Sequence, residues 1–184
     1  VCRLLESGKN VVTTSFLFHP ASLPASDLRR LTDACARGRS AVHGTGINPG
    51  FVGDVLVLVL SGLCGAIESV HVSERGNWSL YDSPAMVFDL ARFGHAPEEV
   101  ALENHPYARF MSGLFLESVG LVAEGLGIAL EQTRTLQEIE LAAAEFEAAG
   151  RTVRRGAVSG QRYRWQGLRA AEPVIEIEAL WTIG

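Results

Sequence analysis

The first 44 residues alternate helix-like and strand-like segments, and this alternation constrains the fold more than any other feature. A short amphipathic segment ends near Gly8 and leads into a strand-like run over residues 11–14. A helical pattern over residues 25–37, with Ser26 as its expected cap and Gly38 at its end, precedes a short strand over residues 40–43. This order is typical of parallel strands joined by helices, so we predict the second half of a doubly wound parallel sheet. Because the pattern begins within an αβ unit, we expect the chain to be the later part of a longer protein.

The remaining residues, 45–184, have a different pattern and predict an α+β domain with a mostly antiparallel sheet of about four strands. A long helix with many small residues is expected over residues 106–126, ending near Gly127. Residues 142–149 also have helical propensity. The other expected elements are a buried helix over 51–64, a strand over 66–72, a short helix from 83 to 91, and strands over 137–147, 153–165 and 173–182. We therefore expect an α/β chain, with the domain boundary between residues 44 and 45.

Composition and charge exclude several classes of function. The chain has 16 basic and 21 acidic residues, a net charge of −5 and no long basic block, so we expect no nucleic-acid partner. Its most apolar run, residues 55–60, is far shorter than the roughly 20 residues that span a bilayer, so we expect no membrane partner. The 3 cysteines are widely spaced and form no C-x-x-C pair, which favours a cytoplasmic location over a disulfide framework or a zinc site.

The loop over residues 44–50 reads G-x-G-x-x-x-G and lies between an expected strand and an expected helix. Asn48 is suited to cap that helix, and Pro49 to occupy its first position. A helix N-terminus offers free N–H groups to an anion, but Pro49 removes one donor, and the strand is not the first of its domain. We favour a tight strand-to-helix hinge that lines a ligand cleft; a pyrophosphate loop and a purely structural turn are the alternatives.

Small hydroxyl residues end the earlier strand, where a parallel sheet binds its ligands. Thr13, Thr14 and Ser15 could therefore contact a cofactor, although Thr also favours strands and Ser favours turns. His19 and His43 follow strand ends on the same expected side and are candidate acid/base or substrate contacts, or else packing residues. The five histidines form no metal-binding spacing, so no metal site is predicted.

Three segments resemble one family of enzymes. They are residues 6–14 (ESGKNVVTT), 44–51 (GTGINPGF) and 156–165 (GAVSGQRYRW), of which the second is the most specific. The family is that of the dihydrodipicolinate-reductase-like NAD(P)-dependent oxidoreductases, in the branch of 2,4-diaminopentanoate dehydrogenase and the native amine dehydrogenases. The resemblance implies that residues 1–44 are the remaining half of a Rossmann domain without its glycine-rich nucleotide loop. Residues 45–184 would form the substrate-binding and oligomerisation domain.

The resemblance also implies ligand contacts, with NAD or NADP as the cofactor and a small molecule as the substrate. The implied cofactor-binding residues are Thr13, Thr14, Ser15, Gly44, Thr45, Gly46 and Asn48. The implied substrate-binding residues are Phe16, His19 and Asn48. A homodimer or homotetramer would form through the antiparallel sheet.

Two departures from the family limit what is carried over. The His-His-x-x-Lys signature of dihydrodipicolinate reductase is absent, and Lys9 is the only lysine. Where the amine-dehydrogenase branch has an acidic residue after the strand, residues 15–18 are the uncharged Ser-Phe-Leu-Phe. This predicts a less cationic, more apolar substrate or a proton donor from elsewhere, and no catalytic residue is assigned.

The sequence therefore predicts an NAD(P)H-dependent oxidoreductase that acts on a C=N or C=O group in a cleft between two domains. The absent acidic residue motivates one alternative, a non-catalytic binding or dimerisation module derived from the same fold. A nucleotide-binding regulatory domain of another class is the third hypothesis. Hydride transfer by the full-length protein separates the first from the other two, and NADPH binding without turnover favours the third.

Overall fold

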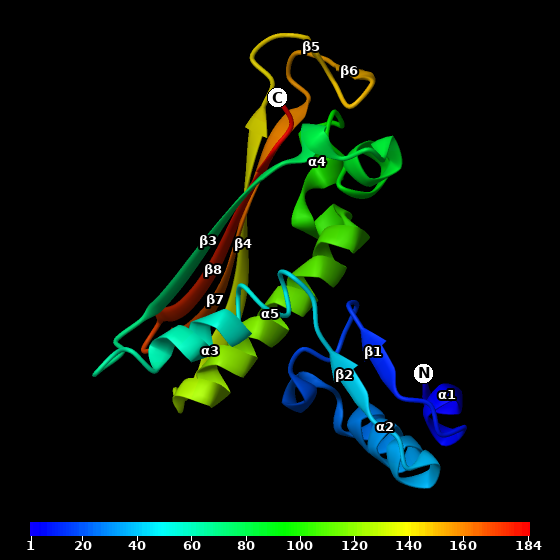
Figure 1. Cartoon of the computed structure of the whole chain (residues 1–184). Helices are drawn as coiled ribbons and strands as arrows, with labels where there is room; N and C mark the ends of the chain where they lie inside the picture. Colours follow the sequence, from blue (N-terminus) through cyan, green and yellow to red (C-terminus); the bar gives the residue numbers. More distant parts are fainter. The chain divides into compact units, whose positions relative to one another are not determined.

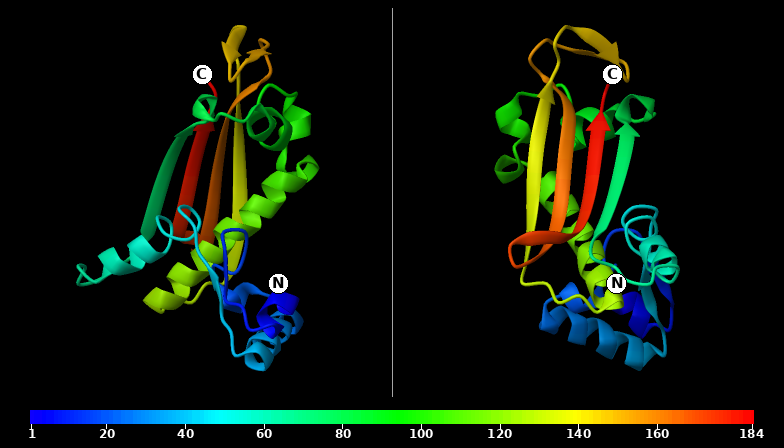
Figure 2. Two further views of the ribbon diagram at one scale, coloured as in Figure 1. Left: turned by 45° about the vertical axis from the view of Figure 1, so that its right-hand side comes forward. Right: turned by 90° about the vertical axis from the view of Figure 1, so that its left-hand side faces the viewer.

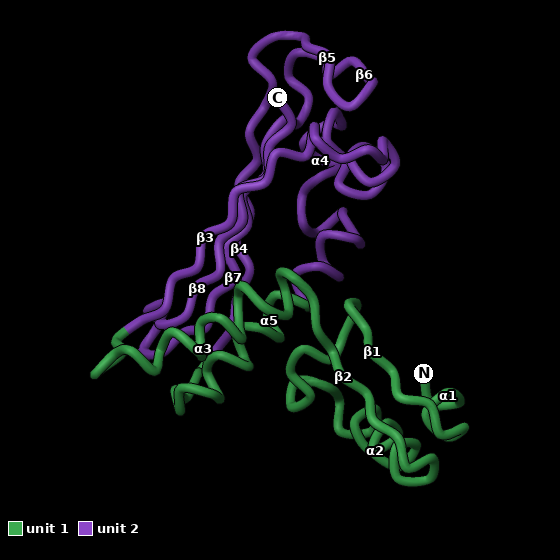
Figure 3. The backbone as a smooth tube through the Cα atoms, in the orientation of Figure 1, with its two compact units in different colours: residues 1–68, 114–131 green, residues 69–113, 132–184 purple.

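The computed structural model describes residues 1–184, which divide into two compact units (Figure 3). Unit 1 comprises residues 1–68 and 114–131, and unit 2 comprises residues 69–113 and 132–184. The long helix α5 (Pro106–Leu126) belongs to unit 2 up to residue 113 and to unit 1 from residue 114. The predicted domain boundary between residues 44 and 45 stays a prediction.

Unit 1 contains two short parallel strands joined by a helix (Figure 1). The pairing runs from Val11 opposite Val42 to Thr13 opposite Gly44, so both strands end at the same edge. The elements in chain order are α1 (Cys2–Glu6), β1 (Val11–Thr13), the short helix η1 (Pro20–Ser22), α2 (Ala25–Gly38) and β2 (Val42–Gly44). The predicted helix–strand–helix–strand order and the parallel pairing are confirmed.

The expected caps of α2 were wrong. Its N-cap is Pro24, not Ser26, and no side chain caps it. Gly38 is the last helical residue, and the left-handed residue that ends the helix is Arg39, with φ of 49°. A Cβ at Gly38 would lie 1.8 Å from the carbonyl oxygen of Leu5. The glycine is therefore required by the close approach of α1, and not by the turn that follows the helix.

The helix after the glycine-rich loop begins later than predicted. It is α3 (Val55–Ser61), and its N-cap is Asp54, whose carboxylate accepts from the N–H of Val55 at 2.6 Å. The expectation that Asn48 caps a helix over 51–64 was therefore wrong, and the Asn48–Pro49 peptide is cis. An aspartate directly before the apolar run is as good a cap as asparagine, and here it is the one used.

Helix α5 matches its predicted bounds. Pro106 begins its 21 residues, and Gly127 follows its end with φ of +66°, the left-handed conformation typical of a C-terminal glycine. Within unit 1, a Cβ at Gly125 would lie 2.6 Å from the Leu58 side chain, so α3 packs directly on this glycine. The small residues of α5 thus allow close packing of a neighbouring helix.

Unit 2 is built on a four-stranded sheet of order β3-β8-β7-β4, seen face-on in the right-hand view of Figure 2. The β4–β7 and β7–β8 pairs are antiparallel and β3–β8 is parallel. The strands are β3 (Val70–Asn77), β4 (Gln132–Leu141), β7 (Val158–Arg169) and β8 (Glu172–Thr182). The mostly antiparallel sheet and the mixed α/β class are confirmed.

Several strand boundaries in unit 2 were wrong. The strand expected over residues 66–72 begins at Val70 and continues to Asn77, because its whole length pairs with β8. The strand expected over 137–147 stops at Leu141, after a register shift between Glu140 and Leu141. Residues 142–149 form no helix; they lead into the small hairpin of β5 (Phe146–Ala148) and β6 (Arg151–Val153).

The two faces of this sheet differ. One face carries Tyr163, Trp165 and Trp181: the first two rings stack, and Trp181 packs at an angle on both of them and on Trp78. Short helical segments supply groups that contact this face: η2 (Trp78–Leu80), η3 (Ala85–Leu90), α4 (Pro97–Val100) and η4 (Leu102–Asn104). The opposite face is polar, with ion pairs that join Glu138 to Arg162 and Arg164, and Arg162 to Glu178.

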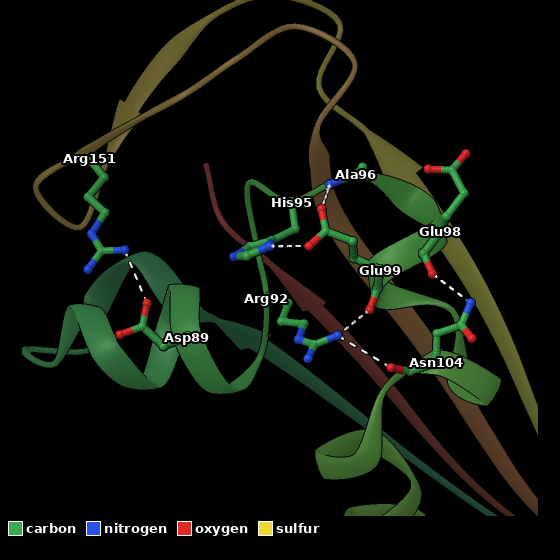
Figure 4. A network of polar contacts seen from close by, with 8 residues as sticks. All are labelled: Asp89, Arg92, His95, Ala96, Glu98, Glu99, Asn104 and Arg151. Atoms are coloured by element: carbon green, nitrogen blue, oxygen red, sulfur yellow. Dashed lines mark hydrogen bonds and ion pairs between the residues drawn. The ribbon is translucent and has the colours of Figure 1, made fainter.

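A polar network holds the loop between η3 and η4 (Figure 4). Arg92, with φ of 57°, donates to the carbonyl oxygens of Glu99 at 2.6 Å and Asn104 at 3.4 Å. The Glu99 carboxylate lies 3.2 Å from the His95 ring and accepts from the N–H of Ala96 at 3.4 Å. Side chains therefore satisfy the main-chain groups that this irregular segment leaves unpaired.

Candidate functional site

A cavity of about 440 Å³ lies in unit 1 beside the carboxyl ends of β1 and β2. Its walls are mostly apolar, and its polar groups come from His43, Thr45 and the Asp54 carboxylate. The lining residues are Leu17, Phe18, Pro20, Val42, His43, Gly44, Thr45, Gly50, Phe51, Asp54, Val55 and Leu121. A largely apolar cavity at the ends of parallel strands is where α/β sheets bind small ligands, so this cavity is the candidate site.

The glycines of the 44–50 loop are required by contacts of the chain with itself. A Cβ at Gly44 would lie 2.3 Å from the carbonyl oxygen of Leu17, and one at Gly46 would lie 2.3 Å from that of Pro49. Gly50 has φ of +119°, and its Cβ would lie 2.1 Å from the Gly46 nitrogen. The space that these glycines leave is filled by backbone, whereas a pyrophosphate loop keeps such space open for phosphate. The loop is thus a tight turn, and Gly44, Thr45 and Gly50 lie at the cavity wall.

Asp54 holds this loop and was missed by the sequence reasoning. Its side chain is fully buried and accepts three hydrogen bonds: from the N–H of Gly50 at 3.0 Å, from the N–H of Val55 at 2.6 Å and from the Ser118 hydroxyl at 2.8 Å. A buried carboxylate is stable only with such partners. The sequence feature that could have identified Asp54 is its position immediately before the apolar run of residues 55–60.

The loop that follows β1 is held by two glutamates of α5. Glu117 accepts from the N–H groups of Phe18 at 2.7 Å and His19 at 3.2 Å. The His19 ring lies between the Ser22 hydroxyl, 2.7 Å from Nδ1, and the Glu124 carboxylate, 2.6 Å from Nε2. A Cβ at Gly120 would lie 2.6 Å from His19 Nδ1, so the helix has a glycine where the ring packs.

The predicted site residues occupy different surroundings. Thr13 and Thr45 meet at the strand ends, where the Thr45 N–H donates to the Thr13 carbonyl at 2.9 Å. Thr14 and Ser15 are exposed just beyond, and the Ser15 N–H donates to the Thr13 hydroxyl at 3.2 Å. Thr45 lines the cavity together with Gly44, whereas the other predicted residues of the loop, Gly46 and Asn48, are not in its lining.

The predicted substrate contacts are not brought together. Phe16 lines a separate hollow of about 470 Å³ near the start of the chain, among residues such as Leu23 and Leu31. Both ring nitrogens of His19 have partners within unit 1, as described above. His43, by contrast, is exposed and lines the cavity itself. The ligand-binding roles of Phe16, His19 and Asn48 stay predictions.

Unit 2 has a much smaller cavity of about 10 Å³ among the aromatic rings. A chain of hydrogen bonds runs beside it: Gln137 donates to the Tyr163 hydroxyl, Tyr163 to Gln161, and Gln161 to the Ala91 carbonyl, at 2.9, 2.7 and 2.7 Å. Burial raises the pKa of Tyr163 well above its usual range. His105 is 2% exposed, and burial, assisted by the charge of Arg92, lowers its pKa. This small cavity belongs to a packed core.

Residues 1–184 contain no group of three or more His, Cys, Asp or Glu side chains placed to hold a metal ion. None of the helices combines the length and the hydropathy that crossing a membrane requires.

Comparison with known proteins places the chain among dehydrogenases. The family described as the 2,4-diaminopentanoate dehydrogenase C-terminal domain matches residues 51–181. An amine dehydrogenase of Streptomyces virginiae is 26% identical over 183 residues, which cover 97% of this chain and 50% of that protein. The 2,4-diaminopentanoate dehydrogenase of Acetoanaerobium sticklandii is 27% identical over 131 residues, which cover 67% of this chain and 35% of that protein. The chain thus spans half the length or less of these relatives.

A solved structure has the same fold. The amine dehydrogenase from Mycobacterium smegmatis matches with a TM-score of 0.72 at 18% sequence identity, over 100% of this chain and 54% of that one. At this identity the likeness shows the fold alone. The resemblance inferred from the three sequence segments is confirmed.

Proposed function

Because the chain belongs to the family of 2,4-diaminopentanoate dehydrogenase C-terminal domains, we propose that the full-length protein is an NAD(P)-dependent oxidoreductase acting on an amine or imine. Its relatives, an amine dehydrogenase and a 2,4-diaminopentanoate dehydrogenase, support an oxidoreductase role. The observation that carries the proposal is the cavity of about 440 Å³ at the carboxyl ends of β1 and β2. Reduction of a related C=O group in the same cavity is the nearest variant of this activity.

The residues at the cavity fit the nicotinamide end of such a cofactor better than its phosphates. The glycines of the 44–50 loop leave no open space for pyrophosphate, as their Cβ positions show. The apolar walls and the hydroxyls at the strand ends suit a flat ring with an amide. Thr45, which lines the cavity, would hold that ring, with Thr13, Thr14, Ser15, Gly44, Gly46 and Asn48 as the other expected contacts. NAD and NADP share this ring, so these residues are compatible with either.

The chain's own residues would orient the reactants and exclude water. When bound, the cofactor supplies or accepts a hydride. The side chains of Phe18, Phe51 and Leu121 form an apolar wall that lowers the local dielectric, which strengthens any polar contact to the substrate. Two side chains in the lining with exchangeable protons, the His43 imidazole and the Thr45 hydroxyl, could hold or move a proton.

A second candidate function is a binding or dimerisation module without catalysis. The uncharged residues 15–18 favour it, because the amine-dehydrogenase branch has an acidic residue at this place. Association into a homodimer or homotetramer through the sheet of unit 2 is compatible with both functions. A cytoplasmic location is part of the same proposal, since Cys2, Cys35 and Cys64 are all free thiols.

The full-length gene product separates these functions. Purified protein would be incubated with NADH or NADPH, ammonia and a panel of small apolar ketones and aldehydes, and cofactor oxidation followed. We expect turnover, and a fall in kcat/KM for Thr45→Val at an unchanged melting temperature. Thr32→Val is the matched control, because Thr32 is an exposed residue of α2. Binding of NADPH without turnover would indicate a regulatory domain, and no binding would indicate an assembly module.

A further inference from the structure

Helix α5 contacts both loops that line the cavity of unit 1. Glu117 and Glu124 are seven positions apart and lie on the same side of the helix, with Leu121 between them. Leu121 is itself part of the cavity lining. Ser118 is the next residue to Glu117 and reaches the second loop. Both carboxylates accept hydrogen bonds from the loop after β1, Glu117 from main-chain N–H groups and Glu124 from the His19 ring.

Glu117 holds the backbone of Phe18, a residue that lines the cavity. A single carboxylate oxygen of this residue accepts from two consecutive main-chain N–H groups, those of Phe18 and His19. The preceding residue, Leu17, has φ of 69°, which is uncommon for any residue except glycine. Such a backbone persists only where its surroundings hold it. Charge-assisted hydrogen bonds from main-chain N–H groups to a partly buried carboxylate are a strong means of holding it.

Ser118 acts on the other loop through Asp54. Its hydroxyl donates to the carboxylate oxygen that also accepts from the N–H of Gly50. Gly50 and Asp54 both line the cavity. Two adjacent residues of α5 therefore hold two different loops that line the same cavity.

We propose that Glu117 is a positioning residue that sets the shape of this cavity for its ligand, with Ser118 in a secondary role through Asp54. Glu117 acts through the backbone of the Phe18 loop and does not touch the reacting atoms. This inference rests on the proposed function, because it assigns Glu117 to the use of the same cavity. A displacement of the loop by about 1 Å is enough to lower turnover about 100-fold when reacting groups must be aligned.

The test compares Glu117→Leu with Glu117→Gln in the full-length protein. Leucine removes both hydrogen bonds, whereas glutamine keeps a neutral acceptor of about half the strength. We expect kcat/KM for the carbonyl substrate to fall about 100-fold in Glu117→Leu and to an intermediate value in Glu117→Gln. Glu145→Leu and Glu145→Gln are the matched controls, because Glu145 is exposed in unit 2, and we expect wild-type kinetics from both.

Amide hydrogen exchange gives a readout that does not depend on turnover. The N–H groups of Phe18 and His19 should exchange faster in Glu117→Leu than in the wild type, while those of β1 and β2 stay protected. If Glu117→Leu does not fold, Ser118→Ala and Glu117→Gln take its place, with smaller changes in the same direction.

The outcomes distinguish the inference from the proposed function. A wild type without turnover overturns the proposed function, and this inference with it. A wild type with turnover and a Glu117→Leu variant within twofold of it overturns the positioning role alone, as does Phe18 exchange that does not change. The proposal is supported if Glu117→Gln is more active than Glu117→Leu and its Phe18 N–H exchanges more slowly than that of Glu117→Leu.

Discussion

The two units of this chain are stabilised by different means. In unit 2, long strands pair over their whole length, and rings pack against one another: Tyr163 and Trp165 stack with centroids 5.5 Å apart, and Trp78 lies 5.3 Å from Trp181. In unit 1 the strands have three residues each, and the irregular loops depend on polar groups such as the buried Asp54 and the half-buried Glu117. Extensive packing makes unit 2 tolerant of the loss of a single polar contact. A few directed hydrogen bonds make the cavity of unit 1 sensitive to single substitutions.

Removal of an aromatic ring from unit 2 should have the largest effect on stability. Trp165 is 1% exposed, and Trp165→Ala would lose its packing and leave a void, at a cost of about 3–5 kcal/mol. Urea denaturation followed by circular dichroism measures this free energy of unfolding. Leu80→Ala, at a side chain that is 78% exposed, is the control and should change it little. A cost below about 1 kcal/mol for Trp165→Ala would show that ring packing does not dominate unit 2.

The loss of Asp54 should cost less but act more locally. Asp54→Ala leaves the Gly50 N–H and the Ser118 hydroxyl without their acceptor and removes the cap of α3, at a cost of about 2 kcal/mol. Asp54→Asn should recover part of this, because its amide oxygen still accepts. Urea denaturation gives the cost, and hydrogen exchange should show faster opening in α3 than in unit 2. The exposed Asp82→Ala is the control; equal opening in both units would contradict the local role of Asp54.

Stability should depend on pH through His105. Burial lowers its pKa in the folded state below the ordinary value of 6.5, so the unfolded chain binds more protons as pH falls below that value. Above pH 6.5 the protonation of His105 does not change the free energy of unfolding. As pH falls from 6.5 toward the lowered pKa, this free energy decreases by up to about 1.4 kcal/mol per pH unit. Melting curves of wild type and His105→Gln between pH 5 and about 8 measure this. A wild-type slope that survives in His105→Gln would assign it to other groups.

The smallest effect is expected at the exposed pair of His95 and Glu99. The hydrogen bond from His95 lowers the pKa of Glu99, so the pair stabilises the folded state above the ordinary carboxylate pKa and loses this as pH falls. Water and salt screen exposed charges, so Glu99→Gln should shift the melting temperature less than any variant above. Differential scanning calorimetry at two salt concentrations tests this. A shift as large as that of Asp54→Ala would show that the network in Figure 4 does more than order a surface loop.

Local patterns predicted the regular elements of both units. The alternation in residues 1–44 predicted the parallel strand pair, and small and apolar residues between Pro106 and Gly127 predicted α5. The carboxyl ends of parallel strands share an edge, so the sequence pointed to this edge for a ligand site, and Gly44 and Thr45 of the predicted residues line the cavity there. The side chains that shape it were not found, because Glu117 is 99 positions from Phe18 and Ser118 is 64 positions from Asp54.

Neighbouring residues and short motifs were enough to predict the family of the chain and most of its longer helices and strands, although several of their bounds were wrong. That Asp54 rather than Asn48 caps α3 follows from the folded structure. The Asp54 carboxylate accepts hydrogen bonds from Gly50, Val55 and the distant Ser118. The tertiary structure also shows why the loop has glycines. Gly44 lies against the backbone of Leu17, a contact that no local sequence pattern specifies. Hydrogen bonds and close contacts between distant residues exist only once the chain is folded, and the shape of the cavity depends on them.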